Sequence, residues 1–356
     1  MSARDNVIQF LNGTTILAGK HNATNSMIRL ASNESPRPPF PPVLSAISEL
    51  LTQNTHLYPD IGCGRLTTAL ARHLNRHTDE ILVAGGATSL IRLAARVFSG
   101  PQAPIISADP SFAMYAIAAD MASAPLISTP LNVKLRVDLD AMLGAISPQV
   151  GLIFLCNPNN PTGTSLDFDN IKRFVEQVPE HVAVVIDEAY LEYVTNPGFR
   201  SAISLVNEHP NLVVLRTFSK VYALAGLRIG YAVAQPPILR RLLFHQARDT
   251  ITSVSQRAAL EALKHPDLVV ERVATNASER SRVFTALKSM GVDVIQSQAN
   301  FHFIRSGPHG KSLHQPLFDR NILTRKLTTG AIRVSIGTPE QNNTFLNAIL
   351  DIITKR

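Results

Sequence analysis

Short, wholly apolar segments that alternate with helical patterns are the feature that most constrains the fold of this chain. The segments Ile81–Ala84 (ILVA) and Leu152–Cys156 (LIFLC) have no polar residue at alternate positions. Strands of this kind are buried on both faces, as in parallel sheets whose crossover helices cover each side. We therefore predict an α/β fold with a mostly parallel sheet flanked by helices. The remaining strand candidates of this region are Ile105–Ala108, Val182–Ile186, Leu212–Leu215 and Ile229–Ala234.

The last third of the chain has a different pattern, with longer helices and fewer strands. Helices are expected at Leu239–Leu263, Val269–Met290 and Pro339–Ile353, and strands at Phe301–Arg305 and Ile332–Ile336. The 356 residues exceed what one ordinary core accommodates, so we expect a second, smaller α+β domain. The expected division is an N-terminal arm and part of the small domain at 1–40, a large domain at 41–245 and a small C-terminal domain at 246–356.

Composition and charge argue against several classes of protein. With 45% hydrophobic and 17% charged residues, and no apolar stretch of about 18 residues, we expect a globular protein without a membrane span. The N-terminus lacks the apolar core of a secretory signal, and Cys63 and Cys156 have no metal-ligand spacing. We therefore expect reduced thiols, no metal and a cytoplasmic location. The net charge of +7 comes from dispersed Lys and Arg, which disfavours nucleic acid as a partner and favours an anionic cofactor or substrate.

The segment Thr217–Lys220, followed by Arg228, is the strongest indication of chemistry. It lies between two strand candidates. A buried lysine has a lowered pKa and is a nucleophile that condenses with an aldehyde, while hydroxyls and the planar guanidinium of Arg228 suit a phosphate. Taken alone, a Ser-Lys pair is more often a solvated surface lysine, so the prediction depends on the other motifs.

Three further motifs follow strand candidates. Asp187 ends a buried strand, at the side of an open α/β sheet where ligands bind; in isolation such a residue is more often a helix cap. The turn Asn157–Gly163 (NPNNPTG) is held by its prolines and glycine, and Gly85–Ser89 (GGATS) offers backbone N–H groups to an anion at a helix N-terminus. A carboxylate such as Asp187 suits a cofactor whose pyridine ring accepts electrons, because it stabilises a protonated ring nitrogen. The N–H groups at Gly85–Ser89 suit a phosphate on the same cofactor.

Together and in this order, the motifs resemble the fold-type-I pyridoxal phosphate (PLP) aminotransferases, and more closely the histidinol-phosphate aminotransferase family. The resemblance implies PLP as the cofactor, a large domain with a mostly parallel seven-stranded sheet, and a smaller domain built from both chain ends. It covers nearly the whole chain, and its matching segments are Asn33-Glu34, Tyr58-Pro59-Asp60, Pro110-Ser111-Phe112, Asn157–Gly163, Asp187–Tyr190, Thr217–Arg228 and Ile332-Arg333.

The resemblance also implies a role for each residue around the cofactor. Lys220 is expected to form the Schiff base and to move the proton between the substrate Cα and the cofactor. Asp187 is expected to pair with the pyridinium nitrogen, Tyr190 and Asn160 to bind the phenolic oxygen, and Phe112 to stack on the ring. The residues expected at the phosphate are Ala87, Thr88, Thr217, Ser219, Arg228 and, from the other subunit of a homodimer with shared active sites, Tyr58.

For the substrate, the resemblance implies that Arg333 binds the α-carboxylate of a small-molecule amino acid. Arg325 matches the position that helps bind the phosphate of histidinol phosphate, and Asn33, Asn160 and Arg37 complete the expected substrate set. The implied reaction moves an amino group from an amino acid or an amino-alcohol phosphate to a 2-oxo acid, commonly 2-oxoglutarate, in amino-acid biosynthesis.

Three departures from the family pattern leave the substrate open. Thr88-Ser89 stands where an acidic pair is usual, Arg37 replaces an active-site tyrosine, and Asp249-Thr250 replaces a Pro-Tyr pair. Arg37 and Arg325 together suit an anionic tail, whereas Asp249 suits a cationic tail such as a guanidinium; a solvated loop arginine is the simpler interpretation of Arg37. The cationic alternative implies a PLP-dependent eliminase or cyclase that acts on an arginine-derived amino acid in specialised metabolism.

Overall fold

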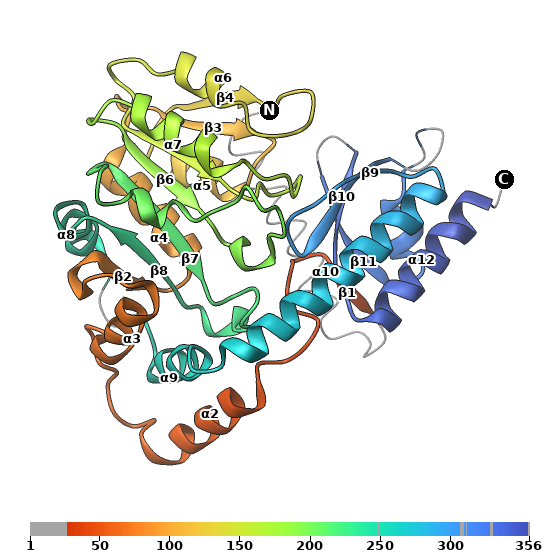
Figure 1. Ribbon diagram of the computed structural model, residues 1–356, viewed down its shortest axis with the longest axis horizontal. Helices are drawn as coiled ribbons and strands as arrows, with labels where there is room; N and C mark the ends of the chain where they lie inside the picture. Colours follow the sequence, from red (N-terminus) through yellow and green to blue (C-terminus); the bar gives the residue numbers. More distant parts are fainter. Residues whose placement is uncertain (1–26, 248–249, 307–309, 311, 328–329, 355–356) are drawn as a thin grey trace.

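The computed structural model describes residues 27–247, 250–306, 310, 312–327 and 330–354. Figure 1 shows two bodies, a larger one around a long sheet and a smaller one at the other end of the molecule. The long helix α10 (Pro266–Ser289) runs from the larger body into the smaller one. Among the described residues, no helix combines the length and the apolar character that crossing a membrane requires.

A seven-stranded sheet forms the centre of the larger body. Its strands are β2 (Ile81–Ala84), β3 (Ile105–Asp109), β4 (Leu126–Pro130), β5 (Leu152–Cys156), β6 (Ala183–Asp187), β7 (Leu212–Thr217) and β8 (Gly230–Ala234). They lie in the order β2-β8-β7-β6-β5-β3-β4, and β8 alone is antiparallel to its neighbours. The expected mostly parallel sheet is confirmed, and β5, β6 and β7 are buried at every residue.

Helices cover both faces of this sheet, as apolar strands require. Phe154 of β5 packs in one cluster with residues of α4 (Ala87–Phe98), α5 (Met114–Met121) and α8 (Pro236–His245). Its neighbours Ile153 and Leu155 point to the other face, into a cluster with residues of α3 (Gly64–Leu74), α6 (Leu139–Gly144) and α7 (Phe168–Gln177). Successive residues of one strand thus belong to two separate cores.

The smaller body combines the beginning and the end of the described chain. Its sheet has the order β1-β11-β12-β10-β9, in which β1 pairs parallel with β11. Helices α10, α11 and α12 contribute to the core beside this sheet, which confirms the expected α+β domain. The bounds are β1 (Ile28–Leu30), β9 (Asp293–Ile295), β10 (Phe301–Ser306), α11 (His314–Phe318), β11 (Ile322–Lys326), β12 (Ile332–Ser335) and α12 (Pro339–Thr354).

The expected helix at Leu239–Leu263 is wrong, because this segment forms two helices. Helix α8 ends at His245, and α9 (Ser253–Ala262) begins after Thr252, whose side chain accepts a hydrogen bond from the Ser255 N–H (3.1 Å). Between them, the side-chain amide of Gln246 donates to the Val83 carbonyl (2.9 Å) and ties the interruption to the sheet.

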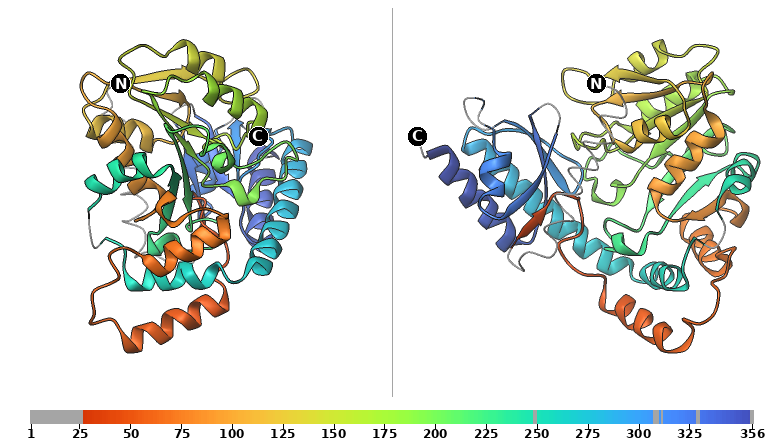
Figure 2. Two further views of the ribbon diagram at one scale, coloured as in Figure 1. Left: turned by 60° about the vertical axis from the view of Figure 1, so that its left-hand side comes forward. Right: turned by 180° about the vertical axis from the view of Figure 1, so that it is seen from behind.

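Helix α9 packs against α2 (Pro41–Gln53) and α3, and Figure 2 shows α2 and α9 together on one side of the larger body. Ala258, Ala259 and Ala262 belong to the core of the larger body. The expected domain boundary at residue 246 therefore stays a proposal, with α9 on the large-domain side of any division.

Candidate active site

The predicted site residues gather at the carboxyl-terminal edge of the large sheet. Cys156, Asp187 and Leu215, at or near the ends of β5, β6 and β7, lie side by side in the strand register. The segment Asn157–Gly163 follows β5 directly, and Thr217–Lys220 begins at the last residue of β7. Parallel strands bring their carboxyl ends to one edge, so residues far apart in sequence meet there.

Asp187 is a buried carboxylate, 2% exposed, that accepts two hydrogen bonds. The Tyr115 hydroxyl donates to its Oδ2 (3.0 Å), and the Ala189 N–H donates to its Oδ1 (3.1 Å). Burial raises the pKa of Asp187 to about 6, against the lowering effect of the Tyr115 hydrogen bond. At neutral pH the carboxyl group is therefore mostly ionised. The adjacent Glu188 pairs instead with Arg216 (2.8 Å).

Lys220 lies in the turn that follows β7. Its Nζ donates to the carbonyl oxygens of Ser32 (3.4 Å) and Asn33 (3.2 Å) and lies 5.4 Å from the centre of the Tyr190 ring. Burial, and then the positive charge of Arg333, lower the pKa of Lys220 to about 8. Near pH 8, a sizeable share of the Lys220 amine is therefore neutral, and the neutral amine is the form that acts as a nucleophile.

A hydrogen-bonded network brings residues from several segments to Tyr190. The Tyr190 hydroxyl accepts from the side-chain amides of Asn33 (3.0 Å) and Asn160 (3.4 Å). Arg333 of β12 donates to Asn160 Oδ1 and to the Ala31 carbonyl (2.8 Å). Burial raises the pKa of Tyr190 to about 12, so its hydroxyl stays protonated and remains able to donate. The smaller body thus supplies the positive charge that faces the larger body's site.

Arg333 combines burial with an unused donor. Its Nε is buried without a hydrogen-bond partner among the residues that the structure describes. Burial lowers the pKa of Arg333 to about 10, which still leaves the guanidinium charged at neutral pH. A buried cation with a spare N–H suits a carboxylate ligand, since a bidentate pair would satisfy it.

The start of α4 and Arg228 form a cup for a phosphate. Gly86 precedes α4 with φ +87°, and no side chain caps the helix N-terminus at Ala87 and Thr88. A Cβ on Gly86 would be strained at this φ and would lie 2.8 Å from Arg228 Nη2, so a larger residue would displace the guanidinium. The Thr217 hydroxyl donates to the Ser219 hydroxyl (2.9 Å), and Arg228 Nη1 lies 3.5 Å from the same oxygen. A helix N-terminus, an arginine and hydroxyls match a phosphate dianion.

Phe112 lies beyond the end of β3, at the same edge of the sheet. Its half-buried ring makes an edge-to-face contact with Tyr115 (5.8 Å between ring centres). Together with the amine, carboxylate, phenol and phosphate cup, this ring completes a set of residues that fits PLP.

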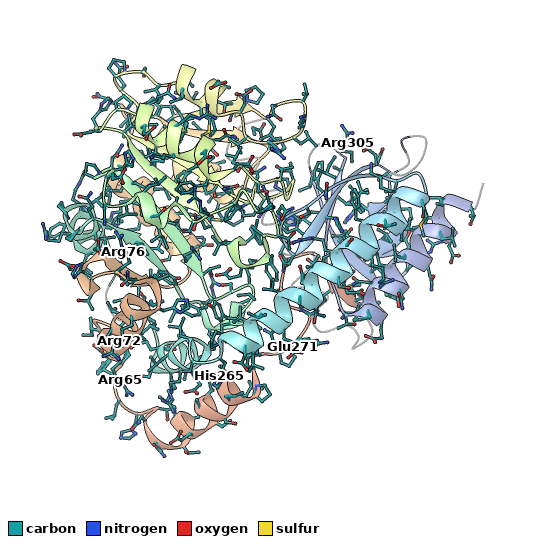
Figure 3. The ribbon with its side chains drawn as sticks, in the orientation of Figure 1. Arg65, Arg72, Arg76, His265, Glu271 and Arg305 are labelled. Carbon is teal, nitrogen blue, oxygen red and sulfur yellow. The ribbon has the colours of Figure 1, made fainter. Side chains whose placement is uncertain are left out.

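Some expected residues do not join this set. Arg37 forms an ion pair with Glu271 of α10 (3.8 Å), which Figure 3 labels, and lines a pocket of about 410 Å³ together with Gln341. Neither Lys220 nor Arg333 lines that pocket. Tyr58, which is expected to reach the phosphate of the other subunit, is 91% exposed.

Two further expectations have different outcomes. Arg325 of β11 lies opposite Arg333 in the strand register, and burial lowers the pKa of its guanidinium. It is therefore next to the expected carboxylate site. Asp249, on which the eliminase or cyclase alternative depends, lies outside the described residues.

Sequence reasoning missed Tyr115, the side-chain partner of Asp187. The available signal was its position three residues after Phe112, which is close to one helical turn. That spacing alone does not show which strand end the hydroxyl reaches, because Asp187 is 72 positions away in the chain.

The chain matches the family model described as aminotransferase class I and II over residues 25–349. It is 40% identical over 319 residues to an aromatic amino acid aminotransferase of Mycolicibacterium vanbaalenii, covering 90% of each chain. The protein with this name from Cutibacterium acnes is 37% identical over 322 residues, covering 90% of this chain and 91% of the relative.

A solved structure agrees with these sequence matches. Histidinol-phosphate aminotransferase from Sinorhizobium meliloti, solved in complex with pyridoxal-5'-phosphate, superimposes with a TM-score of 0.86 at 26% identity. The match covers 92% of this chain and 90% of that one. The fold, the arrangement of the site and these relatives together show that the chain belongs to the class I and II aminotransferases and uses PLP as its cofactor.

Proposed function

We propose that this aminotransferase takes its amino group from an aromatic amino acid and passes it to a 2-oxo acid. The observation that carries the proposal is the buried guanidinium of Arg333, whose Nε has no partner within the described residues while its other nitrogens hold Asn160 and Ala31. Such a group suits the α-carboxylate that all amino acids share. The names of the relatives near 40% identity support an aromatic side chain.

Lys220 is the residue that we assign to proton transfer. When bound, PLP supplies an electron-accepting ring, which makes the substrate's Cα proton acidic. With a pKa of about 8, the Nζ of Lys220 can hold and release this proton at physiological pH. The carbonyl oxygens of Ser32 and Asn33 orient the amine.

Asp187 and Tyr190 have complementary charge states in this proposal. The ionised Asp187 would oppose positive charge on the ring nitrogen, and the protonated Tyr190 hydroxyl would donate to the ring's phenolic oxygen. The amides of Asn33 and Asn160 hold that hydroxyl in place. Phe112 would cover one ring face, and the cup at Ala87, Thr88, Thr217, Ser219 and Arg228 would hold the phosphate.

Histidinol phosphate is a second candidate substrate. The observation in its favour is the placement of Arg325 opposite Arg333 in adjacent strands, which brings two arginines together. One cation suits a carboxylate, whereas two suit the higher charge of a phosphate. The name of the structural relative from Sinorhizobium meliloti agrees with this candidate.

A homodimer with shared active sites is part of the proposal. Tyr58 lies in the loop after α2 and is 91% exposed, and Leu57 (57%) and Ile61 (60%) are exposed beside it. Large apolar side chains gathered on one surface are typical of an interface. In a dimer, this loop would reach the partner's phosphate cup, and sedimentation velocity tests the expected mass of two chains.

The proposed substrate is tested by a screen of amino donors with the PLP-loaded protein. Phenylalanine, tyrosine, histidinol phosphate and an arginine derivative are each supplied, first alone and then with 2-oxoglutarate. We expect the aromatic amino acids to convert the cofactor to its amine form, seen in its absorbance, and glutamate to appear when 2-oxoglutarate is added. If histidinol phosphate is the only donor that converts the cofactor, the second candidate substrate is favoured. Repeated turnover of any donor without a 2-oxo acid would overturn both candidate substrates, because amino transfer needs an acceptor.

A further inference from the structure

Among the described residues, Asp187 accepts a side-chain hydrogen bond from Tyr115 alone (3.0 Å), besides the backbone bond from Ala189 (3.1 Å). We propose that Tyr115 is a positioning residue: its hydroxyl orients the Asp187 carboxylate and keeps it ionised opposite the ring nitrogen of the cofactor. This inference rests on the proposed role of Asp187. It assigns a task to a tyrosine that does not itself contact the substrate.

The packing of the Tyr115 ring fixes the position of its hydroxyl, which lies beside Asp187 and the Cys156 thiol. The residue is 1% exposed, and its ring stacks on Phe154 of β5 (4.7 Å between centres, 10° between planes). The edge-to-face contact with Phe112 (88° between planes) restrains it from a second side. Since Tyr115 belongs to α5 and Asp187 ends β6, the hydrogen bond joins two separate elements. A side chain locked by packing is the kind that holds a functional group in position.

The direction of the hydrogen bond follows from the charges. An ionised carboxylate only accepts, so the phenol donates. Burial and the neighbouring Asp187 charge raise the pKa of Tyr115 well above its usual value, which keeps its proton in place. The bond in turn favours the ionised form of Asp187, whose pKa burial has raised to about 6. Without the bond, no side-chain donor would oppose the rise that burial causes in the pKa of Asp187.

Other groups near Asp187 affect its ionisation but do not replace the donor. Lys220 lowers its pKa through charge alone, and Glu188 raises it. Cys156 and Tyr190 are buried and protonated beside it, with pKa values raised by burial. The titratable groups that face Asp187 from the surrounding elements are thus Tyr115, Cys156, Glu188, Tyr190 and Lys220.

The hydrogen bond from Tyr115 is therefore expected to set the pH at which PLP affinity falls on the acid side. A protonated Asp187 cannot oppose a positive charge on the ring nitrogen, so affinity for PLP is expected to fall as the pH drops through the pKa of this carboxyl. Loss of the Tyr115 hydroxyl destabilises the ionised carboxylate and moves that fall to higher pH. A purely structural role for the ring would leave the midpoint unchanged, since phenylalanine preserves both ring contacts.

The experiment compares the wild type with Tyr115→Phe and a matched control, Tyr193→Phe. Tyr193 is also fully buried, 2% exposed, and takes no part in the hydrogen bonds of Asp187. Each apoprotein is titrated with PLP at several pH values from about 5.5 to about 8.5, and the bound cofactor is followed by absorbance. For Tyr115→Phe we expect the acid midpoint of binding about one pH unit higher, a tenfold change or about 1.4 kcal/mol. The control is expected to match the wild type.

Each outcome is decisive. An unchanged midpoint in a folded Tyr115→Phe protein would overturn the proposal and leave the proposed function standing. Failure of the wild type to bind PLP would instead contradict the proposed function. If Tyr115→Phe does not fold, as circular dichroism would show, 3-fluorotyrosine at position 115 keeps the ring and supplies a more acidic donor. It is expected to lower the midpoint, and an unmoved midpoint would again overturn the proposal.

Discussion

Burial has opposite effects on the two central ionisable residues. It lowers the pKa of Lys220 to about 8 and raises the pKa of Asp187 to about 6. Between these values both groups are still mostly charged, yet each lies within reach of its neutral form. One desolvated site thus produces an amine that can become a nucleophile and a carboxylate that can oppose a cation.

At the residue scale, Lys220→Ala is expected to abolish amino transfer. The change removes the only group that we assign to proton transfer at Cα, and general base catalysis contributes about 10²- to 10⁴-fold. Glutamate formation from 2-oxoglutarate measures the loss. Lys172→Ala on α7, whose side chain is about half exposed, is the control and should retain full activity. Full turnover by the Lys220→Ala protein would contradict the assignment.

The capture of PLP by the apoprotein is expected to depend on pH through the Lys220 amine. The rate at which the apoprotein combines with PLP should rise with pH and level off above about 8, because only the neutral Lys220 amine attacks an aldehyde. Stopped-flow absorbance measures this rate. A rate that continues to rise until pH 10 would indicate an ordinary, exposed lysine.

At the element scale, the junction between β2 and α4 depends on a single backbone conformation. Gly86 turns the chain with φ +87° so that the uncapped N-terminus of α4 lies close to Arg228. Arg228 itself has φ +52°, and its Nη1 donates to the Ala225 carbonyl (2.9 Å). The cup thus depends on two short turns with positive φ, which bring Arg228 to the N-terminus of α4.

Gly86→Ala should therefore weaken PLP binding. The new Cβ would lie 2.8 Å from Arg228 Nη2, and the backbone conformation of Gly86 (φ 87°, ψ 164°) costs a residue with a side chain about 1–3 kcal/mol, so we expect a loss of about tenfold or more in affinity. Titration of the apoprotein measures it. Gly144→Ala, at a glycine with no atom within 4 Å of the new Cβ, should bind as the wild type does. Equal affinity of both variants would show that the cup tolerates the methyl group.

At the scale of the whole molecule, the site depends on contact between the two bodies. Arg280 of α10 donates to the carbonyls of Tyr193 (2.9 Å) and Ala299 (3.0 Å), one on each side of the junction. Gln298 accepts from the Thr195 N–H (2.8 Å) and lies beside Ala299. These contacts hold the smaller body where its Arg333 reaches Asn160.

Arg280→Ala should loosen this junction. Two buried carbonyls would lose their donor, at a cost of about 1–3 kcal/mol for each unsatisfied group. We expect a lower thermal midpoint and a raised KM for the amino donor, because Arg333 is no longer held in position. Arg282→Ala, on the same helix but paired at the surface with Glu279, is the control and should change neither quantity. An unchanged KM would show that the contacts of Arg280 are not needed to position Arg333 for substrate binding.

The large sheet, and most of the candidate site at its carboxyl-terminal edge, follow from the amino-acid sequence. Apolar strands such as β5 and β6 have one stable environment, buried on both faces, and their carboxyl ends place Asp187 and Asn160 at the same edge whatever the details of the helices. Lys220 and Arg228 are close in sequence, so one short loop brings them to that edge. The combination of these motifs was sufficient to identify the cofactor.

Only the tertiary structure decided which side chains meet across long separations. The expected helix at Leu239–Leu263 is interrupted where Gln246 bonds to β2, and Arg37 is paired with Glu271. The tertiary structure also placed Tyr115 on Asp187. Periodicity reports which face of an element is apolar, but the partner of a polar group is set by the packing of elements that are distant in the chain.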